Sequence, residues 1–167
     1  MSAPFTIRAA TPADRDAIYA VEEAAFRQAD EATLVDALVA AGSDVLELVA
    51  EDDSKIVGHI LFSRLMVRGS EGDFSAVALA PLAVLPAMQR HGIGAALIEE
   101  AHRHLQDKGE RLSMVLGDPA YYGRFSYTHA RAASFTSDFQ CEALQAVSWG
   151  EAPTTGQLLY APAFSGL

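Results

Sequence analysis

The stretch that decides the fold reads Leu82-Ala83-Val84-Leu85-Pro86-Ala87-Met88-Gln89-Arg90-His91-Gly92-Ile93-Gly94-Ala95-Ala96-Leu97. Its apolar first part predicts a strand that ends near Val84, and a helix is expected from about Gly92. The first turn of any helix has backbone N–H groups without partners inside the helix, and the helix dipole favours negative charge there. Because the glycines at 92 and 94 leave room for close approach, the stretch predicts a site for a phosphate or pyrophosphate.

Two nucleotide-binding motifs fit this stretch poorly. A dinucleotide-binding turn needs a third glycine where this chain has Leu97, and the loop before the glycines is too long. A nucleotide P-loop needs Gly-Lys followed by Ser or Thr, and no such sequence follows. Two glycines that only permit a tight turn into a helix remain an open alternative.

Alternating and helical patterns on both sides of this stretch predict a mixed α/β layer arrangement in one domain, 1–167. Strands are expected at 5–8, 45–50, 56–62, 74–84, 112–116 and 158–160, and helices after Thr11, at 34–39, at 92–108 and as one turn at 120–124. Pro81 predicts an irregularity or a local edge in the fourth strand, because proline cannot donate a ladder hydrogen bond.

The helix after the glycines has the clearest pattern in the chain. It places an apolar stripe on one face, formed by Ile93, Leu97, Ala101 and Leu105, with Ala96 beside it. Glu99 and Arg103 are expected to form an outward pair at i,i+4 spacing.

Composition narrows the classes of function. The formal net charge of -10 and the lack of a basic stripe make nucleic acid and anionic membranes poor partners. The acidic balance weakly favours a cationic acceptor such as an amine, although solubility alone would also explain it. We see no apolar run of the roughly 20 residues that a membrane span needs and no secretory signal. Since the single cysteine, Cys141, has no internal partner, we expect a reducing, cytoplasmic location.

Three features in the right order resemble the GNAT (general N-acetyltransferase) superfamily. Gln89-Arg90-His91-Gly92-Ile93-Gly94 is similar to its acetyl-CoA pyrophosphate loop, in which Gln or Arg, two residues, Gly, one residue and Gly or Ala follow one another. Leu82–Pro86 resembles the family's fourth strand, and the opening around Ile7–Asp14 resembles its usual start. Gly117–Phe125 looks like the YhbS-like bacterial branch.

The resemblance implies a single GNAT-like α/β domain with a mixed, mainly antiparallel central sheet flanked by helices. A V-shaped cofactor cleft would open between the fourth and fifth strands. The backbone of Ala83 and Val84 would bond the pantetheine arm of acetyl-CoA as an added half-strand. The loop would hold the pyrophosphate, and its residues are Gln89, Arg90, His91, Gly92, Ile93, Gly94 and Ala95. Arg90 would add charge near the phosphates, and His91 is expected to be a surface residue.

The implied function is transfer of an acetyl group to a small-molecule or peptide amine, with acetyl-CoA as the acyl donor and no metal. A CoA-binding or sensing module with little turnover is the alternative. Many such domains pair into dimers, and a monomer or a homodimer is expected here.

Tyr122 is the implied general acid to the CoA thiolate. GNAT chains often carry a tyrosine five residues before the aromatic of a terminal Gly-Phe, and here Tyr127 takes the aromatic place. Ser126 departs from the pattern, since glycine is usual there. The alternative is that Tyr122 is a packing aromatic with a satisfied hydroxyl.

A general base is also expected, because most amines are protonated near neutral pH. Glu22, Glu23, Glu47 and Asp118 are candidates by residue type only. His59 is expected to be a packed or edge residue in a strand. The His, Cys, Asp and Glu residues show no metal-binding spacing.

Overall fold

The structure is a computed structural model, and it describes residues 5–166. Its described residues form two compact units. The first comprises the chain up to Phe62 together with Pro81–Arg103, and the second comprises Ser63–Ala80 and the chain from His104 on. Because β3 (Lys55–Gly69), β4 (Gly72–Val84) and α3 (Ile93–Asp107) contribute to both, the division falls inside elements and not in a linker. The single-domain assignment stays a prediction.

The first unit begins with β1 (Thr6–Ala9) and a short 3-10 turn, Pro12–Asp14. The carboxylate of Asp14 accepts a hydrogen bond from the backbone N–H of Thr11 at 2.8 Å, as expected at a helix start. Helices α1 (Arg15–Phe26) and α2 (Asp30–Ala40) follow, and then β2 (Asp44–Asp52) pairs antiparallel with β1.

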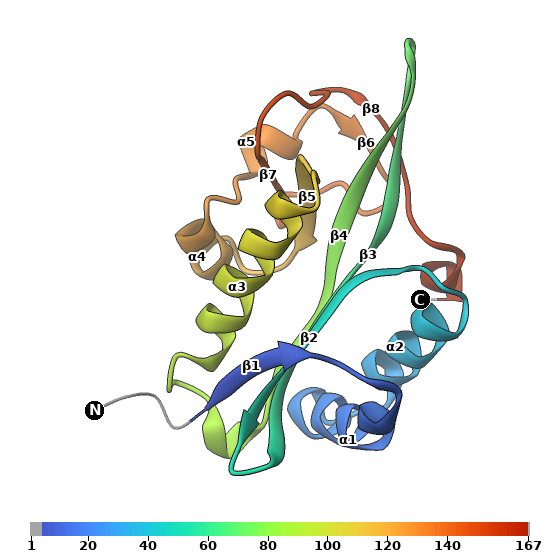
Figure 1. Cartoon of the computed structure of the whole chain (residues 1–167). Coiled ribbons are helices and arrows are strands. Elements are labelled where there is room, and N and C mark those ends of the chain that lie inside the picture. The colour runs from blue at the N-terminus through green and yellow to red at the C-terminus, as the bar shows by residue number, and fades with distance from the viewer. Residues whose placement is uncertain (1–4, 167) are drawn as a thin grey trace. The chain divides into compact units, whose positions relative to one another are not determined.

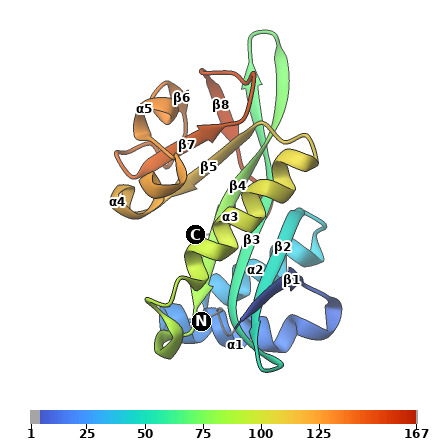
Figure 2. The same ribbon diagram turned by 60° about the vertical axis from the view of Figure 1, so that its left-hand side comes forward.

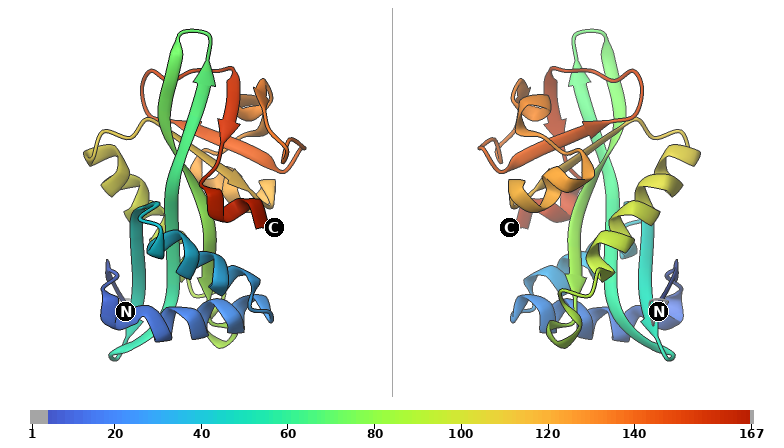
Figure 3. Two further views of the ribbon diagram at one scale, coloured as in Figure 1. Left: turned by 90° about the vertical axis from the view of Figure 1, so that its right-hand side faces the viewer. Right: turned by 90° about the vertical axis from the view of Figure 1, so that its left-hand side faces the viewer.

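Within the first unit, helices cover both faces of the first half of β3. Successive strand residues point to opposite faces, so neighbouring residues contact different helices. A Cβ added to Gly58 would lie 2.9 Å from Ile93 and 3.1 Å from Leu97, so this glycine permits α3 to approach closely. The next residue, His59, contacts Glu22 of α1. Figure 3 shows α1 and α2 on one face of these strands and the start of α3 on the other.

The second unit holds β5 (Leu112–Leu116), α4 (Pro119–Tyr122), the 3-10 turn Gly123–Phe125 and α5 (His129–Ala132). It continues with β6 (Phe135–Thr136), β7 (Leu144–Ser148), β8 (Gly156–Leu159) and the 3-10 turn Pro162–Gly166. Figure 2 shows β5 beside β7, with α4 and α5 next to them. Its core is apolar and includes Leu65, Val67, Ala76, Leu112, Met114, Phe135, Leu144 and Ala146.

The strand order along the sheet is β1-β2-β3-β4-β5-β7, with β8 pairing β3 and β6 (Figure 1). The β1–β2, β3–β8 and β5–β7 pairs are antiparallel, whereas β4–β5 and β6–β8 are parallel. The predicted mixed, mainly antiparallel sheet with helices is therefore confirmed. The β4–β5 register runs from Val77↔Ser113 to Leu79↔Val115 and stops two residues short of Pro81, where an irregularity was predicted.

Several expectations need correction. Arg103 pairs with Glu100 at i,i+3 spacing and not with Glu99 at i,i+4 spacing. Both spacings bring side chains to the same helix face, so the spacing alone could not choose between the two glutamates. In α3 the buried stripe also includes Ile98, while Ala96 is only half-buried. The sequence patterns missed β7, and the last strand ends at Leu159, not at Tyr160. β7 is buried on both faces, so it has no alternating pattern.

Candidate active site

The loop after β4 is held to the first unit by two hydrogen bonds. The backbone N–H of Leu85 donates to the carbonyl of Val57 on β3 at 2.9 Å. The side-chain Nε2 of Gln89 reaches back and donates to the carbonyl of Val84 at 3.1 Å. Gln89 therefore closes the loop on the last residue of β4, a role that its place at the head of the motif did not predict.

Two residues of this loop have left-handed backbone conformations. Gly92 has φ 81°, which glycine adopts without strain, and Arg90 has φ 68°, which costs a non-glycine residue energy. The turn redirects the chain into α3, whose first residue, Ile93, is buried. The buried side chain of Ile93 anchors the helix start.

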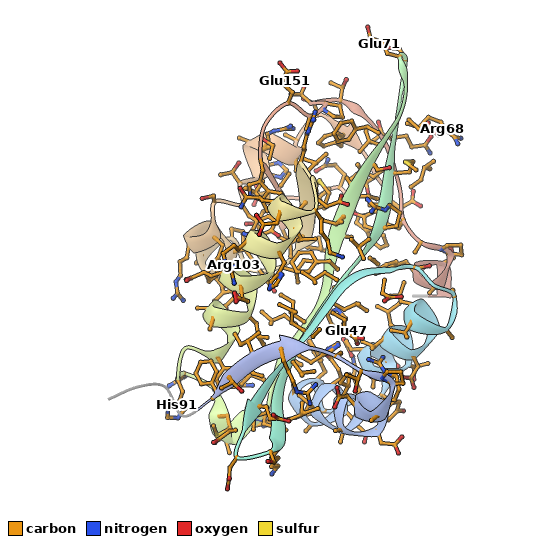
Figure 4. The ribbon with its side chains drawn as sticks, viewed as in Figure 1. Glu47, Arg68, Glu71, His91, Arg103 and Glu151 are labelled. Carbon is orange, nitrogen blue, oxygen red and sulfur yellow. The ribbon has the colours of Figure 1, made fainter. Side chains whose placement is uncertain are left out.

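The start of α3 has the geometry of an anion site. The first helical hydrogen bond runs from the N–H of Ala96 to the carbonyl of Gly92, so the amides of Ile93, Gly94 and Ala95 precede the repeating pattern. Gly92 is exposed and nothing lies within 4 Å of the position of an added Cβ. His91 is exposed on the loop, as expected (Figure 4). All the predicted cofactor-binding residues, from Ala83 to Ala95, thus lie in the first unit.

Tyr122 lies in the second unit, at the end of α4. Asp118 caps this short helix by accepting from the N–H of Ala120 at 2.9 Å. The Tyr122 ring lies against Gly117, where an added Cβ would be 2.5 Å from Cε2 of the ring. It also makes edge contacts with the rings of Tyr121 and Tyr127. Gly117 is therefore required by the position of the tyrosine ring.

The two neighbouring tyrosines differ in their hydroxyl groups. Tyr127 is fully buried, and its hydroxyl shares a 2.8 Å hydrogen bond with Ser113. The hydroxyl of Tyr122 has no hydrogen-bond partner among residues 5–166. Burial raises the pKa of Tyr122 to about 12, so the phenol keeps its proton at neutral pH. Ser126, between Tyr122 and Tyr127 in the sequence, adopts φ 74°.

The candidate base carboxylates divide into two kinds. Glu23 and Asp118 are exposed. Glu22 and Glu47 instead lie on either side of His59, which the sequence had assigned only as a packed or edge residue. His59 Nδ1 is 2.6 Å from Oε2 of Glu22, and His59 Nε2 is 2.7 Å from Oε2 of Glu47.

This cluster, formed by the buried residues Glu22 and His59 and the half-buried residues Arg15 and Glu47, is named here the histidine network. Arg15 Nη2 donates to Oε1 of Glu47 at 2.5 Å (Figure 4 labels Glu47). Each contact between a carboxylate oxygen and a ring nitrogen needs a hydrogen between them. The three residues Glu22, His59 and Glu47 therefore share two protons and carry one net negative charge, which Arg15 balances.

The network has a preferred proton distribution. Burial raises the pKa of Glu22. Burial alone would also raise the pKa of Glu47, but hydrogen bonds from His59 and Arg15 outweigh it and lower that pKa. Burial would lower the pKa of His59, but hydrogen bonds to both carboxylates raise it. Glu47 therefore stays ionised, and the second proton lies between His59 and Glu22.

The structure also bears on metal binding, on membrane spans and on Cys141. Residues 5–166 include no group of three or more His, Cys, Asp or Glu side chains arranged to hold a metal ion. Within the same range no helix is long and apolar enough to cross a membrane. Cys141 is exposed and forms no disulfide.

Comparison with known protein families agrees with this geometry. Residues 6–130 match the model of the acetyltransferase (GNAT) domain. The uncharacterized N-acetyltransferase YjhQ of Escherichia coli K12 is 38% identical over 125 residues, which cover 74% of this chain and 69% of YjhQ.

Two solved structures resemble the whole chain. A GNAT family acetyltransferase from Brucella melitensis, in complex with acetyl-CoA, is 35% identical, with a TM-score of 0.83 over 98% of this chain and 99% of that one. YhbS from Escherichia coli, in complex with CoA, is 30% identical, with a TM-score of 0.88 over 99% of this chain and 94% of that one.

Proposed function

This chain belongs to the GNAT acetyltransferases, an acetyl-CoA-dependent family, and from that premise we propose that it acetylates an amine by direct attack on the thioester. The observation that carries the proposal is the loop from Gln89 to Ala95, which brings the open amides of α3 together with a glycine at positive φ. Similar proteins bind acetyl-CoA and CoA in their solved structures.

In the proposal the backbone of Ala83 and Val84 pairs with the pantetheine arm, as an added strand would. The amides of Arg90 to Ala95 hold the pyrophosphate at the positive end of the α3 dipole. Gln89 keeps the loop closed on Val84, and Arg90 adds positive charge. The V-shaped cleft predicted between the fourth and fifth strands would admit the cofactor.

The proposed chemistry needs no enzyme nucleophile. The neutral amine attacks the thioester carbonyl and forms a tetrahedral oxyanion with a positively charged nitrogen. The nitrogen loses a proton to water, and the oxyanion collapses and expels the CoA thiolate. Tyr122 would protonate or hydrogen-bond that thiolate, since its phenol carries its proton at neutral pH. The open hydroxyl of Tyr122 suits this role better than a packing role.

The acceptor is proposed to be a small-molecule or peptide amine. The net charge of -10 supports a cationic acceptor, since opposite charge raises the rate of encounter. We place the reaction in the cytoplasm because the single cysteine is exposed and forms no disulfide. A monomer or a homodimer would suffice, since the proposed groups all come from one chain.

Calorimetric titration of acetyl-CoA tests the proposal. We expect binding in the micromolar range, about -8 kcal/mol, and loss of that binding in Gly94→Phe, whose side chain would block the amides. Gly69→Phe, on the β3–β4 hairpin, is the matched control and should bind normally. Absence of binding by the parent protein would refute the proposal. If acetyl-CoA binds but no amine in a panel releases free CoA thiol, the chain is a CoA-binding module instead.

A further inference from the structure

Gln145, on β7, is a fully buried polar residue that sequence patterns did not single out. Its strand neighbours Leu144 and Ala146 belong to the apolar core of the second unit, so Gln145 points to the opposite face of the β5–β7 pair. Gln145 pairs with Val115, which shares its face with Ser113, the partner of Tyr127. Gln145 therefore lies on the face that carries the tyrosines.

The side-chain amide of Gln145 has a fixed orientation. Its nitrogen lies 3.1 Å from the carbonyl oxygen of Gly117 and 3.1 Å from that of Ala143. Both partners accept and cannot donate, so the atom between them must be the NH2 group. The other atom, Oε1, is buried and has no donor among the described residues.

These contacts hold the turn against which Tyr122 packs. The N–H of Gly117 donates to the carbonyl of Ala143 at 3.1 Å, and Gln145 binds the carbonyls of both residues. Gly117 is thus fixed at its donor and at its acceptor. The Tyr122 ring lies so close to Gly117 that any movement of this backbone moves the ring.

Packing alone does not explain an amide at this position. A buried acceptor without a donor is unfavourable, and an apolar side chain of the same length would avoid it. The amide is explained by its two donor contacts. We propose that Gln145 is a positioning residue that fixes Gly117 and thereby sets the place of the Tyr122 hydroxyl; this rests on the proposed function of Tyr122.

The test compares two isosteric substitutions. Gln145→Met keeps the side-chain length but removes both donors. Gln140→Met is the matched control, because Gln140 Nε2 also donates to two carbonyls, of Ala132 at 3.1 Å and of Phe135 at 2.8 Å. We expect Gln145→Met to lower kcat at least about tenfold without changing KM for acetyl-CoA, since a small displacement of a reacting group is enough for such a loss. Gln140→Met should leave kcat unchanged.

A double-mutant cycle separates positioning from general loosening. In a Tyr122→Phe background, Gln145→Met should lower kcat no further, because the group that it positions is gone. An equal loss in both backgrounds, or an unchanged kcat in the single variant, would overturn the proposal. If Gln145→Met does not fold, Gln145→Asn, which keeps the amide but shortens its reach, replaces it with the same expectations.

A second readout does not depend on turnover. With fluorotyrosine incorporated, the Tyr122 resonance, assigned by its loss in Tyr122→Phe, should shift or broaden in Gln145→Met and not in Gln140→Met. If Tyr122→Phe leaves kcat unchanged, the general-acid role fails, and the fluorine spectrum alone decides the positioning role. An unmoved Tyr122 resonance in Gln145→Met refutes it.

Discussion

The two units differ in how their buried polar side chains are hydrogen-bonded. In the first unit, the histidine network places a fully buried imidazole between two carboxylates, and Arg15 balances the charge. In the second unit, the Tyr127 hydroxyl is hydrogen-bonded to Ser113, whereas the neighbouring Tyr122 hydroxyl has no hydrogen-bond partner in the described part of the chain. Because both ring nitrogens of His59 contact carboxylates, the histidine network fixes α1 against β2 and β3. The Tyr122 phenol, by contrast, is protonated and makes no hydrogen bond to another described residue.

The hydrogen bonds of the histidine network bear on which carboxylate could act as the general base. Glu22 and Glu47 were candidates by residue type, yet both are engaged with His59, and Glu22 is inaccessible to solvent. The contacts of these two carboxylates with His59 therefore indicate a role in stability. Substitutions at Tyr122 are therefore expected to change activity, and substitutions in the histidine network are expected to change stability.

The largest effect is expected at Tyr122. Tyr122→Phe keeps the ring that packs on Gly117 and removes only the hydroxyl group, so kcat should fall about 10²–10⁴-fold. Affinity for acetyl-CoA should stay within a factor of about two, because the proposed cofactor contacts are made elsewhere. Steady-state kinetics and calorimetry on the same preparation measure both quantities. A variant with unchanged turnover would remove Tyr122 from the mechanism.

The next largest effect is expected on stability, at His59. His59→Gln removes the partner of buried Glu22 and half-buried Glu47 and should lower the free energy of unfolding by about 3–5 kcal/mol in urea titration. Glu23→Gln, one residue from Glu22 but exposed, should change it by less than about 0.5 kcal/mol. Equal effects of the two substitutions would contradict the importance of the network.

The same variant carries a prediction on pH. The pKa of His59 is raised in the folded protein, so its stabilisation is complete below the unfolded pKa of about 6.5 and is lost as pH rises through the folded value. The difference in unfolding free energy between the parent and His59→Gln should therefore shrink as pH rises above about 6.5. A difference that grows above this pH would mean that His59 is buried as a neutral ring.

A smaller effect is expected where the tyrosine ring meets the backbone. Gly117→Ala places a Cβ 2.5 Å from Cε2 of the Tyr122 ring and should lower the unfolding free energy by about 1–3 kcal/mol and reduce turnover. Gly123→Ala is the control, because nothing lies within 4 Å of its added Cβ. If both substitutions leave the melting temperature unchanged, the close contact does not form in solution.

The smallest effect is expected at Ser126, which has a left-handed backbone conformation. Its φ of 74° is unfavourable for a residue with a Cβ, and Ser126→Gly should raise the unfolding free energy by about 0.5–1 kcal/mol. Ser126→Ala, which keeps the Cβ, should give no such gain. Thermal unfolding of the three proteins distinguishes these outcomes, and a loss of stability in the glycine variant would show that the serine hydroxyl has a stabilising contact.

The sequence alone determined the parts of this protein that depend on local order. The motif from Gln89 to Gly94, the strand before it and the stripe of α3 are continuous in the chain, so their pattern predicted the elements. The resemblance of the motif to the GNAT pyrophosphate loop indicated the family. The spacing of Tyr122 and Tyr127 likewise led to the hypothesis that Tyr122 is the general acid, which stays a prediction.

Only the tertiary structure decided which distant residues share an environment. Glu22, Glu47 and His59 come from α1, β2 and β3, and no spacing rule links them. Gln145 meets Gly117 because β7 pairs with β5, and β7 itself was missed because a strand buried on both faces shows no alternation. Hydrogen bonds between groups far apart in the sequence depend on strand order and register. Local sequence patterns do not specify these, and they are fixed only when the chain folds.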